Sequence, residues 1–360
     1  MNSHLFLSYF PKISFPRYKK LQARFLNLEE IWQVEAPELI AAGWEQNTAT
    51  DFITWRETKP EEKILSDLEK TKIKTVCLND PEYPALLKEI NDPPLVLFYR
   101  GELPNSKQVA VAVVGTRRCT NYGKQVCQEI VEGLATQGIL IVSGLALGID
   151  GIAHEATLKM KGKTIAVLGS SVESSNIYPP SHRGLAEKII ANGGTVISEY
   201  PPGFTPTKYS FPMRNRIIAG LTLGSLIIEA PIKSGSLITA RAALDYNRDV
   251  FAVPHPINST MGTGNNNLLK LGAKCITSAD DIIEALNLSG LTQLAIPLIP
   301  KADTANEADI IKTLSREPKS IDNIIKESGL DSPTTMSTLT LLEMKGYIRN
   351  LGGMMYILKN

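Results

Sequence analysis

Seven short, mostly apolar segments recur between residues 108 and 286, separated by stretches with helical periodicity. They lie at residues 109–114, 139–142, 164–168, 195–198, 225–228, 250–253 and 274–276. Continuous apolar runs, rather than strict alternation, are typical of strands that are buried on both faces. Because these runs alternate with helices, they predict right-handed strand–helix–strand units and a mainly parallel sheet, in a Rossmann-like α/β fold.

The sequence predicts a helical domain, a linker and a winged-helix domain in addition to the Rossmann-like domain. Residues 1–62 hold all three tryptophans and predict a small helical domain of SAM or helix-hairpin-helix type. An extended Rossmann-like domain is then expected at 63–286, a linker at 287–303 and a winged-helix domain at 304–360. In the last of these, helices are expected at 308–314, 320–328 and 333–344, with Ser332 as the cap of the third helix and Pro333 at its first position. A hairpin of 347–350 and 354–358 would form the wing.

Composition excludes some classes of protein. The 360 residues carry a formal net charge of +1 and four cysteines, with no C-x-x-C pair and no Cys/His spacing typical of zinc. We therefore expect free thiols, a cytoplasmic location and no metal site. The first eleven residues lack a basic start and a cleavage signature, and no apolar run is long enough for a membrane span.

Three loops at strand ends have the chemistry of phosphate sites. They begin at Gly115-Thr116-Arg117, at Ser143-Gly144 and at Ser234-Gly235-Ser236, and each leads from a strand into a helix. Backbone N–H groups at such junctions bind anions, and ligands of parallel sheets bind beyond the carboxyl ends of the strands. Helix capping alone would explain one such loop, but three on one sheet edge favour a phosphate site.

Common nucleotide cofactors do not fit these loops. A dinucleotide site needs G-x-G-x-x-G, but Arg117 replaces the second glycine, and Ser143 stands where an acidic residue would hold the ribose. Gly162-Lys163-Thr164 imitates the end of a P-loop, yet it precedes a strand and Thr157 replaces its first glycine. We expect no cofactor.

Clustered charge instead favours an extended polyanion. Residues 103–128, 156–172 and 200–228 contain no acidic residue. They carry the following cations: Lys107, Arg117, Arg118, Lys124, Lys159, Lys161, Lys163, Lys208, Arg214 and Arg216. Aromatic residues interleave with these cations, among them Tyr122, Tyr178, Tyr209 and Phe211. A basic groove with aromatic stacking platforms is typical of single-strand binding.

Five motifs together resemble the DprA/Smf (DNA-processing protein A) family. They are VVGTRR (113–118), VSGLALGIDGIAH (142–154), ISEYP (197–201), FPMRNRIIAG (211–220) and SGSLITA (234–240). The resemblance implies a dimeric, non-enzymatic protein that binds single-stranded DNA, protects it and loads RecA recombinase in natural transformation, with single-strand-binding protein as a further candidate partner. It also assigns DNA contact to Arg117, Lys208, Phe211, Arg214, Asn215 and Arg216. The phosphate pocket would comprise Gly115, Thr116, Ser143, Gly144, Gly235, Ser236 and Thr239.

The sequence differs from the family's pattern at two places, and one alternative function is considered. His255 replaces the glycine of the family's Ala-Val-Pro-Gly, and the loop 169–173 lacks a second glycine. The alternative is a nucleotide-cleaving phosphoribohydrolase, whose Gly-Gly-x-Gly-Thr signature is absent here. Glu229 is compatible with catalysis or with a carboxylate that accepts hydrogen bonds from loop N–H groups.

Overall fold

A computed structural model describes residues 3–58, 61–105, 108–288, 302–315, 318–350 and 352–358. The chain divides into two compact units, Met1–Gly290 and Leu291–Asn360, each described here by itself. Most of the predicted linker, at 289–301, lies outside the described residues, as does Lys107. The predicted boundary after residue 62 falls in the first turn of helix α5 (Glu61–Thr71), and the predicted domain boundaries remain predictions.

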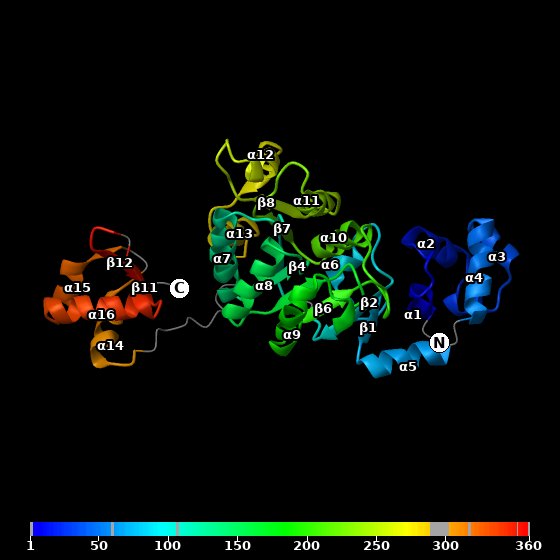
Figure 1. Ribbon diagram of the computed structural model, residues 1–360, viewed down its shortest axis with the longest axis horizontal. Coiled ribbons are helices and arrows are strands. Elements are labelled where there is room, and N and C mark those ends of the chain that lie inside the picture. Colours follow the sequence, from blue (N-terminus) through cyan, green and yellow to red (C-terminus); the bar gives the residue numbers. More distant parts are fainter. Residues whose placement is uncertain are drawn as a thin grey trace. The chain divides into compact units, whose positions relative to one another are not determined.

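Five short helical segments precede α5 (Figure 1), and aromatic side chains pack between them. They are α1 (Ser3–Ser8), α2 (Phe15–Arg24), η1 (Leu28–Trp32), α3 (Ala36–Ala41) and α4 (Gln46–Thr58). Phe10 stacks on Trp44 with ring centroids 6.1 Å apart and meets Phe52 edge-on at 5.3 Å. The aromatic side chains supply most of the apolar volume of this small bundle, because each buries a large area.

The first unit is built on one nine-stranded sheet in the order β1-β2-β6-β5-β4-β3-β7-β8-β9. Neighbouring strands from β6 to β9 pair in parallel, and β1 and β2 add an antiparallel edge. The strands are β1 (Lys74–Cys77), β2 (Val96–Gly101), β3 (Ala110–Val114), β4 (Leu140–Ser143), β5 (Thr164–Val167), β6 (Thr195–Ser198), β7 (Gly224–Ile227), β8 (Asp249–Ala252) and β9 (Lys274–Cys275). This mainly parallel α/β sheet confirms the predicted fold class.

Helices cover both faces of the sheet, as the continuous apolar runs require. In β3, Ala112 and Val114 join one buried cluster, whereas Val111 and Val113 join the other. The second cluster includes residues of α7 (Asn121–Thr136), α8 (Ile149–Lys159) and α13 (Ala279–Ala285). The first includes residues of α9 (Arg183–Ala191), α10 (Ser210–Gly220) and α11 (Ser236–Asp245). The unit also contains α12 (Thr263–Lys270) and the short turns η2 (Ser174–Asn176), η3 (Pro180–His182) and η4 (Thr260–Gly262).

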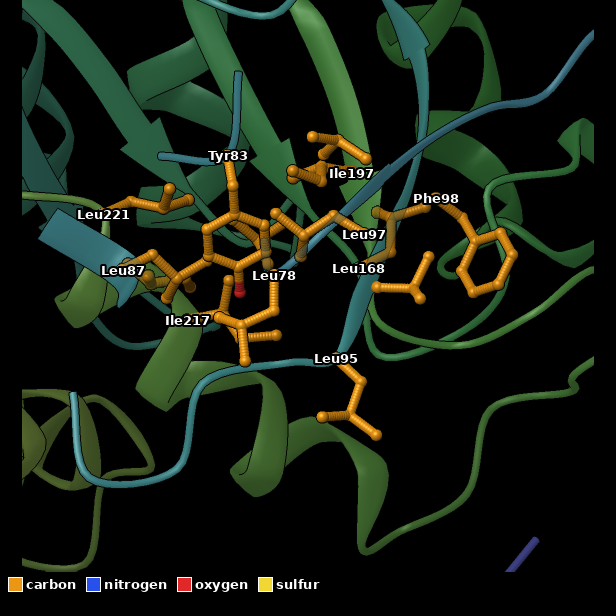
Figure 2. Packing of buried hydrophobic residues seen from close by; sticks show 14 of the residues in the cluster. Leu78, Tyr83, Leu87, Leu95, Leu97, Phe98, Leu168, Ile197, Ile217 and Leu221 are labelled. Carbon is orange, nitrogen blue, oxygen red and sulfur yellow. The ribbon is translucent and has the colours of Figure 1, made fainter. Parts of the chain in front are cut away.

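The segment between α5 and β3 closes one end of the core. Tyr83 and Leu87, around α6 (Ala85–Lys88), pack beside Ile217 and Leu221 at the end of α10 (Figure 2). The Tyr83 hydroxyl donates a hydrogen bond to the carbonyl of the buried Pro94 at 2.8 Å. This packing attaches the antiparallel edge strands to the parallel sheet.

The second unit is a winged helix, as predicted. It consists of α14 (Ala305–Thr313), β10 (Lys319–Ser320), α15 (Ile321–Ser328), α16 (Ser332–Met344), β11 (Ile348–Asn350) and β12 (Met355–Leu358), with its strands in the order β10-β12-β11. One detail was wrong. Asp331, not Ser332, caps α16, because its carboxylate accepts a hydrogen bond from the Thr334 N–H at 2.9 Å. No helix in the described part of the chain is long and apolar enough to cross a membrane.

Candidate nucleic-acid interface

The sheet order creates a crevice between β3 and β7. The chain first extends the sheet from β3 through β4, β5 and β6, and then returns to place β7 on the other side of β3. Such reversals are where ligands of open parallel sheets bind, since the two adjacent loops diverge there. The Thr116 N–H donates a hydrogen bond to the Glu229 carbonyl at 2.7 Å, so the two loops are joined at the base of the crevice.

A cavity of about 980 Å³ opens at this point. It takes residues from the loop after β3, from the first turns of α10 and α11, and from the loop after β7. The predicted site residues among its lining are Gly115, Thr116, Arg117, Lys208, Phe211, Arg214, Asn215, Gly235, Ser236 and Thr239. Gly144 lines a smaller cavity next to it, which shares Arg117, Phe211 and Arg214. The structure therefore brings eleven predicted residues to one surface.

Glu229 holds the loop that carries Arg117. Its carboxylate is fully buried and accepts hydrogen bonds from the Thr120 N–H at 2.7 Å and from the Thr120 hydroxyl at 2.8 Å. Thr120 is the N-cap of α7, so Glu229 fixes both the start of that helix and the end of the loop. The sequence left Glu229 open as a catalytic residue or as an acceptor of hydrogen bonds from the loop. The structure shows the acceptor.

Arg214 is a buried support of the crevice. Only 4% of it is exposed, and its Nη1 donates hydrogen bonds to the Gly144 carbonyl, at 2.5 Å, and to the Val167 carbonyl. Burial lowers the pKa of Arg214 to about 10, and Asp150 opposes that shift. Nε of Arg214 donates to the Asn215 side-chain oxygen at 3.2 Å, and Arg214 lines both cavities, so its contact with DNA stays a prediction.

Asp150 is the buried counter-ion in this support. Its carboxylate accepts a hydrogen bond from the Gly144 N–H at 3.1 Å. Burial raises the pKa of Asp150, while the nearby Arg214 guanidinium acts in the opposite direction. A Cβ atom at Gly144 would lie 2.4 Å from Nη1 of Arg214, so only glycine permits this approach. Gly144 and Asp150 thus position the loop instead of presenting charge to a ligand.

Phe211 is the half-buried aromatic residue of the crevice. Cζ of Arg117 lies 5.5 Å from the centroid of its ring, and the ring of Tyr178 lies 5.6 Å away at an interplanar angle of 51°. Arg117 and Tyr178 are both exposed. A cation and two rings thus lie together at the mouth of the cavity, an arrangement that can hold a base and its phosphate.

Exposed cations surround this aromatic pair. Arg117, Arg118, Lys208 and Lys233 line the cavity, and among the described residues none of the four forms an ion pair with a carboxylate. The first turn of α11, with Ser236 and Thr239, faces the same space and adds the positive end of a helix. The cavity therefore carries unneutralised positive charge that suits phosphate groups.

Two predicted residues lie elsewhere. Ser143 is fully buried and its hydroxyl donates a hydrogen bond to the Val113 carbonyl at 2.6 Å, so it bridges two strands below the cavity. Arg216 pairs with the half-buried Glu199 and, at 3.2 Å, with Asp92. Both assignments need correction, because these side chains are engaged in the core and line neither cavity.

Lys233 is a lining residue that the sequence analysis missed. The acid-free stretch 200–228 ends at Glu229, and Lys233 lies beyond that residue. The search for clustered cations therefore did not include Lys233. Its place in a strand-end loop, one residue before Ser234, could have identified it.

The two departures from the family pattern have local explanations. His255 is buried, and its Nε2 lies 2.9 Å from the Ile228 carbonyl, so this side chain fills the space next to β7. In the loop 169–173, the Glu173 carboxylate accepts hydrogen bonds from the Ser171 hydroxyl at 2.9 Å and from the Gly203 N–H at 2.5 Å. Side-chain contacts therefore shape both segments.

Comparisons with known proteins agree with this geometry. The family model described as DNA recombination-mediator protein A matches residues 74–287, and that of the DprA winged helix domain matches 297–354. Protein Smf of Escherichia coli is 35% identical over 332 residues, which cover 89% of this chain and 86% of that protein.

Two solved structures are also similar. The X-ray structure of DNA processing protein A from Streptococcus pneumoniae has 35% identity and a TM-score of 0.69, over 79% of this chain and 98% of that one. A structure of DNA processing protein A from Helicobacter pylori has 35% identity and a TM-score of 0.53, over 60% of this chain and 96% of that one. The Helicobacter pylori protein is described as having a unique single-stranded DNA binding mode.

Proposed function

Since this chain belongs to the DprA/Smf family of DNA recombination-mediator proteins, we propose that it binds single-stranded DNA in the crevice between β3 and β7. One observation carries the proposal: four exposed cations, which form no ion pair among the described residues, line the same cavity as the half-buried ring of Phe211, and Arg117 lies over that ring. Phosphates would lie against the cations and the start of α11, and a base would lie against the ring.

The geometry favours a single strand over a duplex. The ring of Phe211 belongs to the cavity lining, so a base must leave the stack and the pairing of a duplex before it can lie on that ring. Duplex readers commonly insert a helix or a ribbon into a groove. In this crevice the cations and rings line a hollow instead of standing out from the surface.

The direct test is competition between oligonucleotides of equal length and sequence. A labelled single strand of about 10 nucleotides, within the range that one single-strand site occupies, is bound to the full chain. Unlabelled single strand should displace it at much lower concentration than blunt duplex does. Equal competition, or better competition by duplex, would refute the proposal.

We further propose that the protein acts in the cytoplasm as a dimer during natural transformation, protects incoming single strands and loads RecA recombinase. The family's description as a recombination mediator supports this role. The test is filament formation by RecA on DNA that is covered with single-strand-binding protein. The full chain should shorten the lag, and an Arg117→Ala/Phe211→Ala variant should not. Digestion of bound single strands by a nuclease tests protection in the same reactions.

We propose that the protein is not an enzyme. The competing phosphoribohydrolase activity requires a carboxylate that is free to reach a nucleotide, and here Glu229 is buried and engaged with Thr120. Incubation with nucleoside monophosphates, followed by detection of free base, tests this proposal. Turnover that disappears on Glu229→Gln substitution would contradict it.

A further inference from the structure

The first 28 residues form a fourth acid-free stretch, outside the crevice. They contain Lys12, Arg17, Lys19, Lys20 and Arg24, and the first carboxylate of the chain is Glu29. All of these cations except Lys12 lie on the single helix α2. A cluster of this kind on one helix produces a local positive potential even in a chain of net charge +1.

The structure separates these cations into two groups. Lys12 pairs with Asp51, and Arg17 lies 3.5 Å from Glu45. Lys19, Lys20 and Arg24 are exposed, and in the described part of the chain none of the three pairs with a carboxylate. We call these three residues the α2 basic face; their charge is available to a ligand.

The α2 basic face is held rigidly. Tyr18 and Leu21 are fully buried on the opposite side of α2. Nζ of Lys20 donates a hydrogen bond to the Gly43 carbonyl at 2.6 Å, and the Trp44 indole N–H donates to the Arg17 carbonyl at 3.0 Å. The turn between α3 and α4 therefore lies against α2 and fixes the helix, so little ordering is required when a ligand binds.

The chemistry of the face identifies its ligand. The other exposed positions of α2 are Pro16, Gln22 and Ala23, so the helix presents no large apolar side chain to solvent; the exposed Leu26 lies beyond its end. Protein interfaces are depleted of lysine at their centres, and membrane-surface helices present Trp, Phe or Leu. A polyanion with regularly spaced charges is the remaining partner for such a surface.

We propose that the α2 basic face binds the phosphodiester backbone of DNA, independently of sequence, as a second contact outside the crevice. The inference rests on the proposed function only in taking DNA as the ligand. It predicts that DNA longer than the crevice site, whether a long single strand or a duplex, contacts the α2 basic face, and that a strand just long enough for the crevice does not.

The test compares three variants of the full chain. Lys19→Gln/Lys20→Gln/Arg24→Gln removes the α2 basic face, and Arg117→Ala/Phe211→Ala removes crevice contacts. Lys63→Gln/Lys70→Gln/Lys88→Gln is the matched control, because it removes three exposed lysines and the same charge elsewhere. Thermal unfolding checks that each variant folds. The probes are single strands of about 10 and about 40 nucleotides and a duplex of about 40 base pairs, given that one site holds about 4–16 nucleotides.

We expect the α2 variant to bind the short strand as the wild type does. For the long strand, the slope of log K against log salt should become shallower by about 2, from roughly 0.7 for each of three phosphates. The control variant should change neither the affinity for the short strand nor the salt slope for the long strand. A slope change seen only with duplex would also support the face and would identify duplex as the source of the phosphates.

Unchanged slopes for both the long strand and the duplex would overturn the inference. So would an equal effect of the control variant, because charge anywhere on the surface would then suffice. Failure of the proposed function would give a different result: the wild type would not prefer single strand over duplex of equal length, whatever the α2 variant does.

Discussion

The guanidinium of Arg117 lies over the ring of Phe211, with Cζ 5.5 Å from the ring centroid. One side chain comes from the loop after β3 and the other from the first turn of α10, a distant part of the chain. A phosphate contact and a base contact are thereby placed side by side, and the two can be separated by experiment because only one of them depends on salt.

Substitution of Arg117 should weaken binding to every sequence. Arg117→Ala removes one cation that faces a phosphate, so the slope of log K against log salt should flatten by about 0.7. Fluorescence anisotropy of a labelled single strand at several salt concentrations measures it. An unchanged slope would show that Arg117 is not a phosphate contact.

Substitution of Phe211 should act differently. Phe211→Ala removes a stacking surface and should cost about 1–3 kcal/mol of binding free energy, with little change in the salt slope. The same titrations give both quantities. If Phe211→Ala and Arg117→Ala changed the slope equally, the two roles would be misassigned.

Two glycines should respond in opposite ways to the same change. A Cβ atom at Gly144 would lie 2.4 Å from the buried Arg214 guanidinium, so Gly144→Ala should destabilise the fold by about 1–3 kcal/mol. A Cβ atom at Gly235 meets nothing within 4 Å, and its φ of −63° suits alanine. Gly235→Ala should therefore keep stability and weaken DNA binding, because the new methyl group would project where the backbone approaches a phosphate.

Urea unfolding and single-strand titrations of both glycine variants check this pair. Loss of stability in Gly235→Ala would contradict the open space at that position. Unchanged affinity in that variant would remove Gly235 from the phosphate pocket.

Arg216 should matter for stability and not for DNA contact. Arg216→Met leaves the largely buried carboxylate of Glu199 without its partner, which should cost about 3 kcal/mol of unfolding free energy. The folded fraction of the variant should bind single strands as the wild type does. Intact stability combined with lost binding would restore Arg216 as a DNA contact.

The winged helix should not be the main DNA reader. The side of α16 exposed to solvent carries Met336, Leu341 and Met344 together with hydroxyl side chains, and no Arg or Lys lies within the helix. Groove readers project such groups from this helix to base edges. Removal of residues 304–360 should change single-strand affinity by less than about threefold, which is below roughly 1 kcal/mol. A much larger loss from a folded truncation would place the binding in the tail.

The central sheet was predictable because its strands are buried on both faces. Each predicted run matches a strand whose ends lie close to its own, from β3 to β9. Strand β1 was missed, since it lies at the edge of the sheet, pairs only with β2 and has one exposed and one half-exposed residue among four. Short edge strands lack the apolar run on which such predictions depend.

The crevice was predictable in outline but not in the role of each cation. Phe211, Arg214 and Asn215 share one face of α10, because residues three and four apart do so, whereas Arg216 points to another side. The helical period alone could have separated Arg216 from this group. The burial of Arg214 could not be predicted in that way, since it depends on Gly144 and Asp150, which come from a distant part of the chain.

Ultraviolet crosslinking of a short single strand tests most directly where the DNA lies. A thymidine oligonucleotide of about 10 nucleotides, enough for one single-strand site, would be crosslinked to the full chain and the modified peptides mapped. We expect crosslinks at Phe211 and Tyr178, which line the cavity, and their loss in the Arg117→Ala/Phe211→Ala variant. Crosslinks confined to residues 3–58 or 302–358 would contradict the central claim that the crevice between β3 and β7 holds the DNA.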